Sequence, residues 1–393
     1  TFEKNIVRIK QYWNIAEIPI NESIAYPQAV HHCAELFTQA IRRRIVPANG
    51  KTIVFLSGGL DSGRIAAELK RQGCHFTTYT SRGFKPTNPD GPVAKEVART
   101  LGLENTFINL PSRNFMTDYF PRVAELVDYE TRLHQPYLPL IEALPDYCKV
   151  NFDGIAGDVA FNAVLRSSEF IDSDQFVAVQ SCSPDQLAAK LIVERHNFSV
   201  LSPRIHQHLL WPDVVETVKC ELHKFSGTPN QLTCWYLSNR TRRAIALASL
   251  KLISLKTESW MPFYDNDLLE FVMSLPPLMK IQNRLRNDMT KSRYPEFYQV
   301  FQSRQNIPEQ GDDIQYRRQK RQFMRWNTRR YFLGENWIFQ NTQAAPRLFQ
   351  DFIISHFRSE HNCYLYNYSF LVFFEYLKRY FPKGNGLLDI PVS

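Results

Sequence analysis

One short stretch decides the fold, and it reads Thr52-Ile53-Val54-Phe55-Leu56-Ser57-Gly58-Gly59-Leu60-Asp61-Ser62. Its first five residues are apolar or β-branched, which predicts a buried strand. Two glycines stop that strand, and apolar residues at three- and four-residue spacing predict a helix over residues 62–72. Strand, glycine loop and helix in this order are the unit from which parallel α/β sheets are built.

The alternation of strands and helices continues on both sides of this unit. Further strands are predicted at 75–80, 106–110 and 149–152, with helices at 27–45, 93–101 and 138–144. After residue 162 only helical patterns stand out, at 186–195, 231–253 and 364–380. We therefore expect an α/β fold with a doubly wound parallel sheet and a mostly helical C-terminal part. The expected division is 1–50 (link and helix), 51–165 (α/β domain), 166–300 (mostly helical) and 301–393 (C-terminal helical region).

The glycine loop has the chemistry of a phosphate site. Backbone N–H groups of such a loop and the positive end of the following helix attract a phosphate group. No Gly-Lys-Ser/Thr ending is present, so the loop is not a Walker loop. Asp61 would repel phosphate unless a cation such as Mg²⁺ lay between them. The alternative is a plain tight turn in which Asp61 and Ser62 only cap a helix.

A second turn, residues 153–158, follows the strand predicted at 149–152. Because the carboxyl ends of parallel strands meet at one edge of a sheet, we expect Asp61 and Asp158 to converge there. Their carboxylates should lie within about 10 Å of each other, a span that one pyrophosphate with its Mg²⁺ ions can bridge. We also expect Asp61→Asn to abolish ATP–pyrophosphate exchange and to leave the fold intact.

Several segments, in order along the chain, resemble the asparagine synthetase family, which includes β-lactam synthetases and lasso-peptide cyclases. The string 57–62 is similar to the pyrophosphate loop of ATP pyrophosphatases, and the turn 154–158 to the family's second metal loop. The resemblance covers roughly residues 10 to 290 and implies the adenine nucleotide α-hydrolase type of sheet. The remaining matching segments are Tyr12-Trp13, 94–102 and Trp260-Met261-Pro262-Phe263-Tyr264-Asp265 with its continuation to Pro276.

The resemblance implies ATP and Mg²⁺ as cofactors. Asp61 and Asp158 would hold Mg²⁺, while Tyr79 and Gly154 would border adenosine. A substrate carboxylate would be adenylated with release of pyrophosphate, and an amine would then displace AMP to form an amide. The implied ATP-binding residues of the loop are Ser57, Gly58, Gly59, Leu60, Asp61 and Ser62.

The chain departs from the family pattern at several positions. Ile155 and Val159 stand where the family carries glutamates, and the arginine that opens the Trp260 segment is missing. An apolar residue cannot take a proton from an attacking amine, which disfavours aspartate with ammonia as the substrates. The lysine that neutralises the transition state has no unique match. The candidates for it are Lys280, Arg284 and Arg286, with Lys291 as a further one.

Three functions follow from these observations. The first is an ATP-dependent amide-forming ligase, with asparagine as the plainest product. The second is a peptide macrolactam (lasso) or β-lactam cyclase that uses the same adenylation. The third is an inactive scaffold of the same fold. Retention of both Asp61 and Asp158 argues against the scaffold, because two buried carboxylates without a cation are costly.

Composition limits the partners. The chain has 393 residues, a net charge of +8 and seven scattered cysteines without a Cys-x-x-Cys pair, which disfavours a disulfide framework or a zinc site. No apolar stretch reaches the roughly 20 residues of a membrane-spanning helix, and no secretion signal opens the chain, so we expect a cytoplasmic protein. The partner should be a small-molecule or peptide carboxylate rather than nucleic acid or a membrane. A homo-oligomer, a glutaminase domain or partner as ammonia source, and a peptide-binding role for the basic segment 317–330 stay open.

Overall fold

The computed structural model describes residues 10–45, 51–82, 90–109, 115–130, 137–162, 182–192 and 211–306. It also describes positions 2–3, 6–7, 318, 321–322, 325–326, 329–330, 375–376 and 379–380. Apart from 301–306 and the single positions just given, the region expected at 301–393 lies outside these residues, including most of the basic segment 317–330 and most of the helix at 364–380. Residues 193–195 lie outside them as well.

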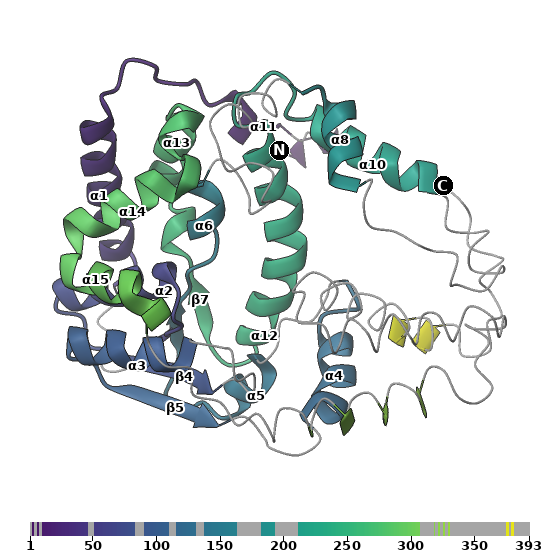
Figure 1. Ribbon diagram of the computed structural model, residues 1–393. Helices are drawn as coiled ribbons and strands as arrows, with labels where there is room; N and C mark the ends of the chain where they lie inside the picture. Colours follow the sequence, from purple (N-terminus) through teal and green to yellow (C-terminus); the bar gives the residue numbers. More distant parts are fainter. Residues whose placement is uncertain are drawn as a thin grey trace.

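A five-stranded sheet forms the centre of the molecule, in the order β5-β4-β3-β6-β7, and every neighbouring pair is parallel. Helices cover it (Figure 1), which confirms the predicted doubly wound parallel sheet. The strands are β3 (Thr52–Phe55), β4 (Thr77–Arg82), β5 (Asn105–Asn109), β6 (Val150–Phe152) and β7 (Glu258–Trp260).

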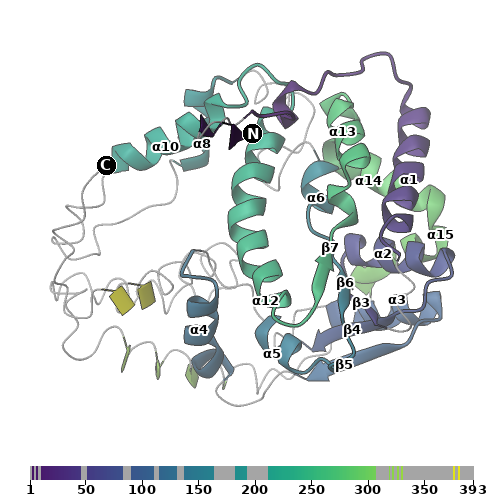
Figure 2. The same ribbon diagram turned by 180° about the vertical axis from the view of Figure 1, so that it is seen from behind.

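The chain winds in two directions from the middle of this sheet. From β3 it proceeds through β4 to β5 on one side, and it then returns to place β6 and β7 on the other side of β3. Figure 2 shows this arrangement from behind. The order reverses between β3 and β6, which is the switch point where open α/β sheets bind ligands.

Alternate residues of β3 face two different cores. Val54 belongs to the larger core, whose helices include α1 (Tyr26–Arg42), α2 (Leu60–Arg71) and α3 (Asp90–Leu101). Ile53 belongs to a smaller core on the opposite face, to which α5 (Tyr137–Glu142) and α12 (Lys251–Ile253) contribute. Burial on both faces explains why the strand reads as a continuous apolar run.

Helices late in the sequence pack against α1, α2 and α3 (Figure 1). The contact between α2 and α15 is close, because a Cβ atom at Gly63 would lie 2.1 Å from Cζ of Phe297. Only glycine allows this approach. The late helices are α13 (Asn266–Ser274), α14 (Arg284–Arg293) and α15 (Pro295–Ser303).

The expectation that strands end near residue 162 is wrong, because β7 adds a fifth strand. It pairs with β6 in the register Val150↔Glu258 to Phe152↔Trp260, and the rings of Phe152 and Trp260 lie 5.5 Å apart. Three residues at a sheet edge, one of them an exposed glutamate, carry too little apolar pattern to be recognised from the sequence.

The predicted helix at 231–253 spans three consecutive elements: α11 (Gln231–Tyr236), a π-helix (Leu237–Leu250) and α12. No helix among the described residues is long and apolar enough to cross a membrane. The remaining helices are α4 (Phe115–Leu126), α6 (Gly157–Ala160), α8 (Pro184–Ile192) and α10 (Trp211–His223), and a short hairpin pairs β1 (Phe2–Glu3) with β2 (Ile6–Val7).

Candidate functional site

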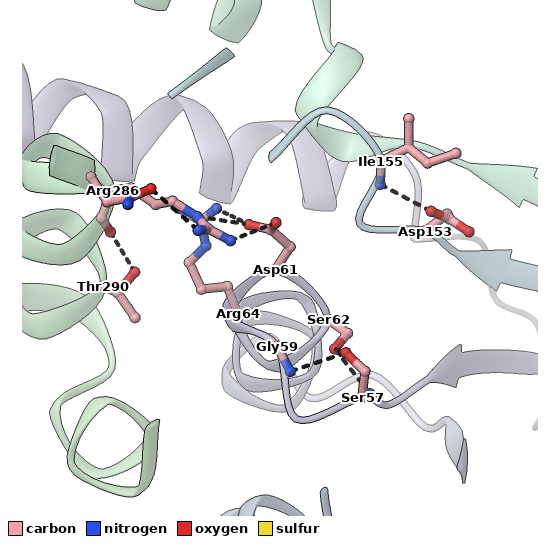
Figure 3. A network of polar contacts seen from close by, with 10 residues as sticks. Ser57, Gly59, Asp61, Ser62, Arg64, Asp153, Ile155, Arg286 and Thr290 are labelled. Atoms are coloured by element: carbon pink, nitrogen blue, oxygen red, sulfur yellow. Dashed lines mark hydrogen bonds and ion pairs between the residues drawn. The ribbon is translucent and has the colours of Figure 1, made fainter. Parts of the chain in front are cut away.

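The first loop, Ser57 to Ser62, joins β3 to α2 and is closed by its own hydroxyl groups (Figure 3). The Ser57 and Ser62 hydroxyl oxygens lie 2.9 Å apart, and the Ser57 N–H donates to Ser62 Oγ over 3.1 Å. The N–H of Gly59 donates to Ser57 Oγ over 3.1 Å. These bonds fix the loop at the positive end of α2, where an anion is favoured.

The first loop packs closely against the start of α3 at Gly58. A Cβ atom at Gly58 would lie 3.0 Å from Asp90 Oδ1 and 3.1 Å from Cβ of Val93. The backbone of the loop therefore sits directly on the start of the neighbouring helix, and a larger residue would push the two apart.

The second loop, Asp153 to Asp158, joins β6 to α6. Its first turn is held by Asp153, whose Oδ1 accepts the N–H of Ile155 over 2.9 Å. Ala156 adopts a left-handed conformation with φ of 70° and directly precedes α6. A side chain in that region of backbone space is strained by about 1–2 kcal/mol.

The two loops lie against each other at the switch point of the sheet. A Cβ atom at Gly157 would be 2.4 Å from Oδ1 of Asp61, and one at Gly154 would be 3.0 Å from Cβ of Asp61. Residues separated by about a hundred positions in the sequence thus meet at one place, because β3 and β6 are adjacent strands. The distance between the Asp61 and Asp158 carboxylates stays a prediction.

Two arginines share the carboxylate of Asp61 (Figure 3). Arg64 Nη2 donates to Oδ1 over 2.5 Å, and Arg286 donates to both oxygens over 3.2 Å and 2.7 Å. Burial opposes ionisation of Asp61, but the charges of Arg286 and Arg64 outweigh it and lower the pKa of the carboxyl group.

The structure corrects two expectations about Asp61. Its side chain is only 17% exposed, so it does not lie on an exposed loop whose substitution leaves the fold untouched. Its charge is also compensated by arginines without any metal ion. The cost of a buried carboxylate therefore no longer argues by itself for a bound cation, nor against a scaffold.

Asp153 is a second unusual acid at the same edge. Burial is the main reason that its pKa is raised from 3.8 to about 6, and the negative charge of Asp61 adds to the rise. The N–H of Ile155 and the amide of Asn151 oppose the shift. This carboxyl group therefore titrates near neutral pH, as acids at functional sites often do.

Of the four candidates for the transition-state lysine, the structure brings Arg286 to the first loop. Lys280 is fully buried, and its ammonium group donates to Asn230 Oδ1 and to the Val272 carbonyl oxygen, both over 3.0 Å. Burial lowers its pKa to about 8. The Arg284 guanidinium lies 4.1 Å from the ring centroid of Tyr26 on α1, and Lys291 is exposed.

The other expected site residues are more dispersed. The Tyr79 side chain is buried in the smaller core, with its hydroxyl 3.2 Å from that of Tyr147, and does not reach the first loop. Ile155 and Val159 are buried members of the larger core. Asp158 is partly exposed in the first turn of α6.

The acids at the two loops are of the kind that a Mg²⁺ ion bound together with a nucleotide would use. Mg²⁺ in nucleotide sites commonly uses one or two carboxylates and takes its other ligands from phosphates and water. Asp61 and Asp158 are two such carboxylates, on loops that touch. In the described part of the chain, no three histidine, cysteine, aspartate or glutamate side chains gather as a metal site.

Sequence analysis missed two residues of this site, Arg64 and Asp153. Arg64 is three residues after Asp61 on a helix, the spacing at which an acid and a base meet, and this signal could have revealed it. The raised pKa of Asp153 depends on its surroundings in the folded chain and leaves no local signal.

Comparison with known families agrees with this geometry. The sequence model described as asparagine synthase matches residues 32–335, which include both loops and the segment that carries Arg286. A comparison with curated proteins finds no match. The chain belongs to the asparagine synthase family, a family of ATP-dependent ligases that form amide bonds.

Proposed function

We propose that the chain activates a substrate carboxylate by adenylation and then joins it to an amine. The carboxylate attacks the α-phosphorus of ATP, pyrophosphate leaves, and the amine displaces AMP to give an amide. The observation that carries this proposal is the contact of the two loops at the switch point between β3 and β6. The family of the chain supports the same reaction class.

The first loop would hold the phosphates of ATP. Its backbone N–H groups and the N-terminus of α2 form an electropositive site. The hydrogen bond between the Ser57 and Ser62 hydroxyls fixes the conformation of the loop there. Gly58 and Gly59 allow the phosphates to approach the backbone closely. Leu60 is buried and anchors the start of the helix.

Arg286 is our choice for the residue that neutralises charge on the departing pyrophosphate. It enters the site from the first turn of α14, and its side chain keeps 12% of its surface exposed. A guanidinium offers several N–H donors in a fixed plane and suits phosphate oxygens. Groups that meet charge as it develops are typically worth about 10²–10³ in rate.

Asp61 and Asp158 would be the protein ligands of Mg²⁺ carried by the nucleotide. When bound, that ion supplies positive charge that stabilises the leaving pyrophosphate. For Asp61 to bind it, at least one of its two arginine contacts must open. Arg286 is the partner that can move, because Arg64 is fully buried.

The natural substrates are not simply aspartate as the carboxylate and ammonia as the amine. Ile155 in the second loop and Val159 in α6 are buried apolar residues at positions where the family carries acids, so neither can take a proton. General-base assistance is typically worth about 10²–10⁴ in rate. A substrate that brings its own neutral amine into a dry site loses less, which favours a peptide macrolactam or β-lactam cyclase as the second candidate.

The test is pyrophosphate release by the purified chain with ATP and Mg²⁺, screened over aspartate with ammonium, free peptides and candidate precursor peptides. We expect release with at least one carboxylate, and turnover on aspartate and ammonium well below the 1 s⁻¹ that is ordinary for a native substrate. Asparagine formation at that rate or faster would overturn the choice of acceptor. If the purified chain does not bind ATP, the inactive scaffold replaces adenylation as the proposed function.

A further inference from the structure

Arg64 is a charged residue in an apolar position. It lies in the second turn of α2, its side chain is fully buried, and it is the largest of the fully buried side chains. Three phenylalanine rings surround its guanidinium, with the Arg64 Cζ atom 4.6, 5.3 and 5.8 Å from the centroids of Phe263, Phe161 and Phe37. Such faces attract a cation but do not satisfy its N–H groups.

Most of the hydrogen-bonding capacity of Arg64 is unused within the part of the chain that the structure describes. Nη2 donates to Asp61, whereas the buried Nε and Nη1 atoms have no hydrogen-bond partner among the described residues. Each unsatisfied buried polar group costs about 1–3 kcal/mol, more when it is charged. An aliphatic side chain would fill the same space without this cost, so packing alone does not account for an arginine here.

The two arginines that bind Asp61 differ in freedom. Arg286 is partly exposed at the start of α14 and has a second acceptor, Asn283 Oδ1, at 3.5 Å. Arg64 is enclosed by the rings, and its guanidinium meets the Asp61 carboxylate next to that of Arg286 (Figure 3). Gly157 closes another side of the same carboxylate.

We propose that Arg64 is a positioning residue that serves as the resident counter-ion of Asp61. It holds the carboxylate in place before any nucleotide arrives and leaves Arg286 free to turn to the phosphates. The proposal rests on the proposed function, because it concerns how the same site receives ATP with Mg²⁺. It adds that the chain carries a fixed cation that competes with Mg²⁺ for Asp61.

Two measurable effects of opposite sign follow from this arrangement. Without the Arg64 charge, the site is less positive, so ATP in the absence of divalent metal should bind more weakly. Without Arg64 as a competitor, Asp61 should take Mg²⁺ more readily, so less Mg²⁺ should be needed for half-maximal ATP binding. Damage to the fold alone would weaken both kinds of binding together.

The experiment measures ATP binding by calorimetry for the full chain, first in EDTA and then along a Mg²⁺ titration. Arg64→Met, which keeps the length and apolar packing of the side chain, should lower ATP affinity in EDTA about tenfold or more. It should also lower the Mg²⁺ concentration for half-maximal binding several-fold. Arg64→Lys keeps the charge and should stay within a few-fold of the wild type in both assays.

Arg99→Met is the matched control, since it removes one positive charge from an exposed arginine on α3 that pairs only locally with Glu96. It should change neither value. Equal losses in Arg64→Met and Arg64→Lys would overturn the proposal, as would a rise in the Mg²⁺ requirement of Arg64→Met. If Arg64→Met does not fold, a tenfold loss of metal-free affinity in Arg64→Lys would overturn it alone, and a value near the wild type would support it.

The two proposals fail in different ways. A wild-type chain that binds no ATP with or without Mg²⁺ would remove the proposed function itself. If the wild-type chain binds ATP but Arg64→Met has the same Mg²⁺ titration as the wild type, only the proposed role of Arg64 is removed.

Discussion

The two loops at the switch point have the same position in the fold and opposite chemistry. The first, Ser57 to Ser62, carries polar side chains, with paired hydroxyls and a carboxylate shared by two arginines. The second, Asp153 to Asp158, turns Ile155 into the core and strains Ala156 to do so. Both follow parallel strands and precede helices, so the difference comes from side chains and not from topology.

This difference separates two parts of the expected reaction. Under the proposed function, the first loop keeps the groups that would bind and stabilise phosphate, which every member of an adenylating family requires. In the second loop, Ile155 is apolar where the resemblance to the family implies an acid that handles the amine. Activation of the carboxylate and choice of the amine can therefore change independently, because they depend on different strands of the sheet.

The largest effect should come from Asp61→Asn. ATP–pyrophosphate exchange should fall by a factor on the order of 10³ or more, because a metal ligand at the first loop is lost. The variant should also be destabilised by about 3–5 kcal/mol, since Arg64 is then buried without its counter-ion. Exchange is measured with labelled pyrophosphate and stability by urea unfolding.

Asp146→Asn is the control for this variant, because the Asp146 side chain is 99% exposed and forms an ion pair of 3.1 Å with Lys256. It should alter neither quantity. Wild-type exchange in Asp61→Asn would show that the first loop is not the nucleotide site.

Arg286→Gln should lower exchange by about 10²–10³ while changing ATP affinity less, since its charge acts on the leaving pyrophosphate. Arg284→Gln, two residues earlier on α14, loses the interactions of the Arg284 guanidinium with the Tyr26 side chain and should keep exchange within a few-fold. Steady-state and exchange rates of both variants are compared. A larger loss in Arg284→Gln would reverse the assignment of the two residues.

Asp153 of the second loop should make the free energy of unfolding depend on pH. The folded pKa of Asp153, about 6, lies above its ordinary value of 3.8, so the folded chain holds this proton more tightly than the unfolded chain. Stability therefore falls as pH rises from about 4 to about 6, by roughly 2–3 kcal/mol for this group. Asp153→Asn should remove that fall.

Urea unfolding of the wild type and of Asp153→Asn at several pH values between 4 and 7.5 tests this. The difference between the two proteins isolates Asp153, because the opposite contribution of Asp61, whose pKa is lowered, is common to both. A difference that stays constant over this range would mean that Asp153 has an ordinary pKa.

The smallest effect is expected at Ala156. Glycine has no penalty at a φ of 70°, so Ala156→Gly should stabilise the chain by about 1 kcal/mol. Ala160→Gly, in the helical part of α6, should instead destabilise it by about that amount or more. Thermal unfolding of both variants gives the sign, and a loss of stability in Ala156→Gly would show that the turn is not strained.

Local sequence patterns determined most of the fold of this protein. The strands β3 to β6 and the helices α1, α2 and α3 lie within a few residues of their predicted ranges, since each has an apolar repeat and a turn signal of its own. The glycine loop at 57–62, between a strand and a helix, was predicted for the same reason. The strand β7 did not, because three residues at a sheet edge hold too little pattern.

The tertiary structure decided how the site is charged. Arg286 reaches Asp61 from 225 residues away, and nothing in its neighbourhood distinguishes it from Lys280 or Arg284. The packing of α14 beside α1 places Arg286 at the loop, whereas Lys280 is buried in the core. The chain sequence fixes which charges exist, but their interaction falls with distance and depends on burial, and both quantities arise only when remote elements pack together.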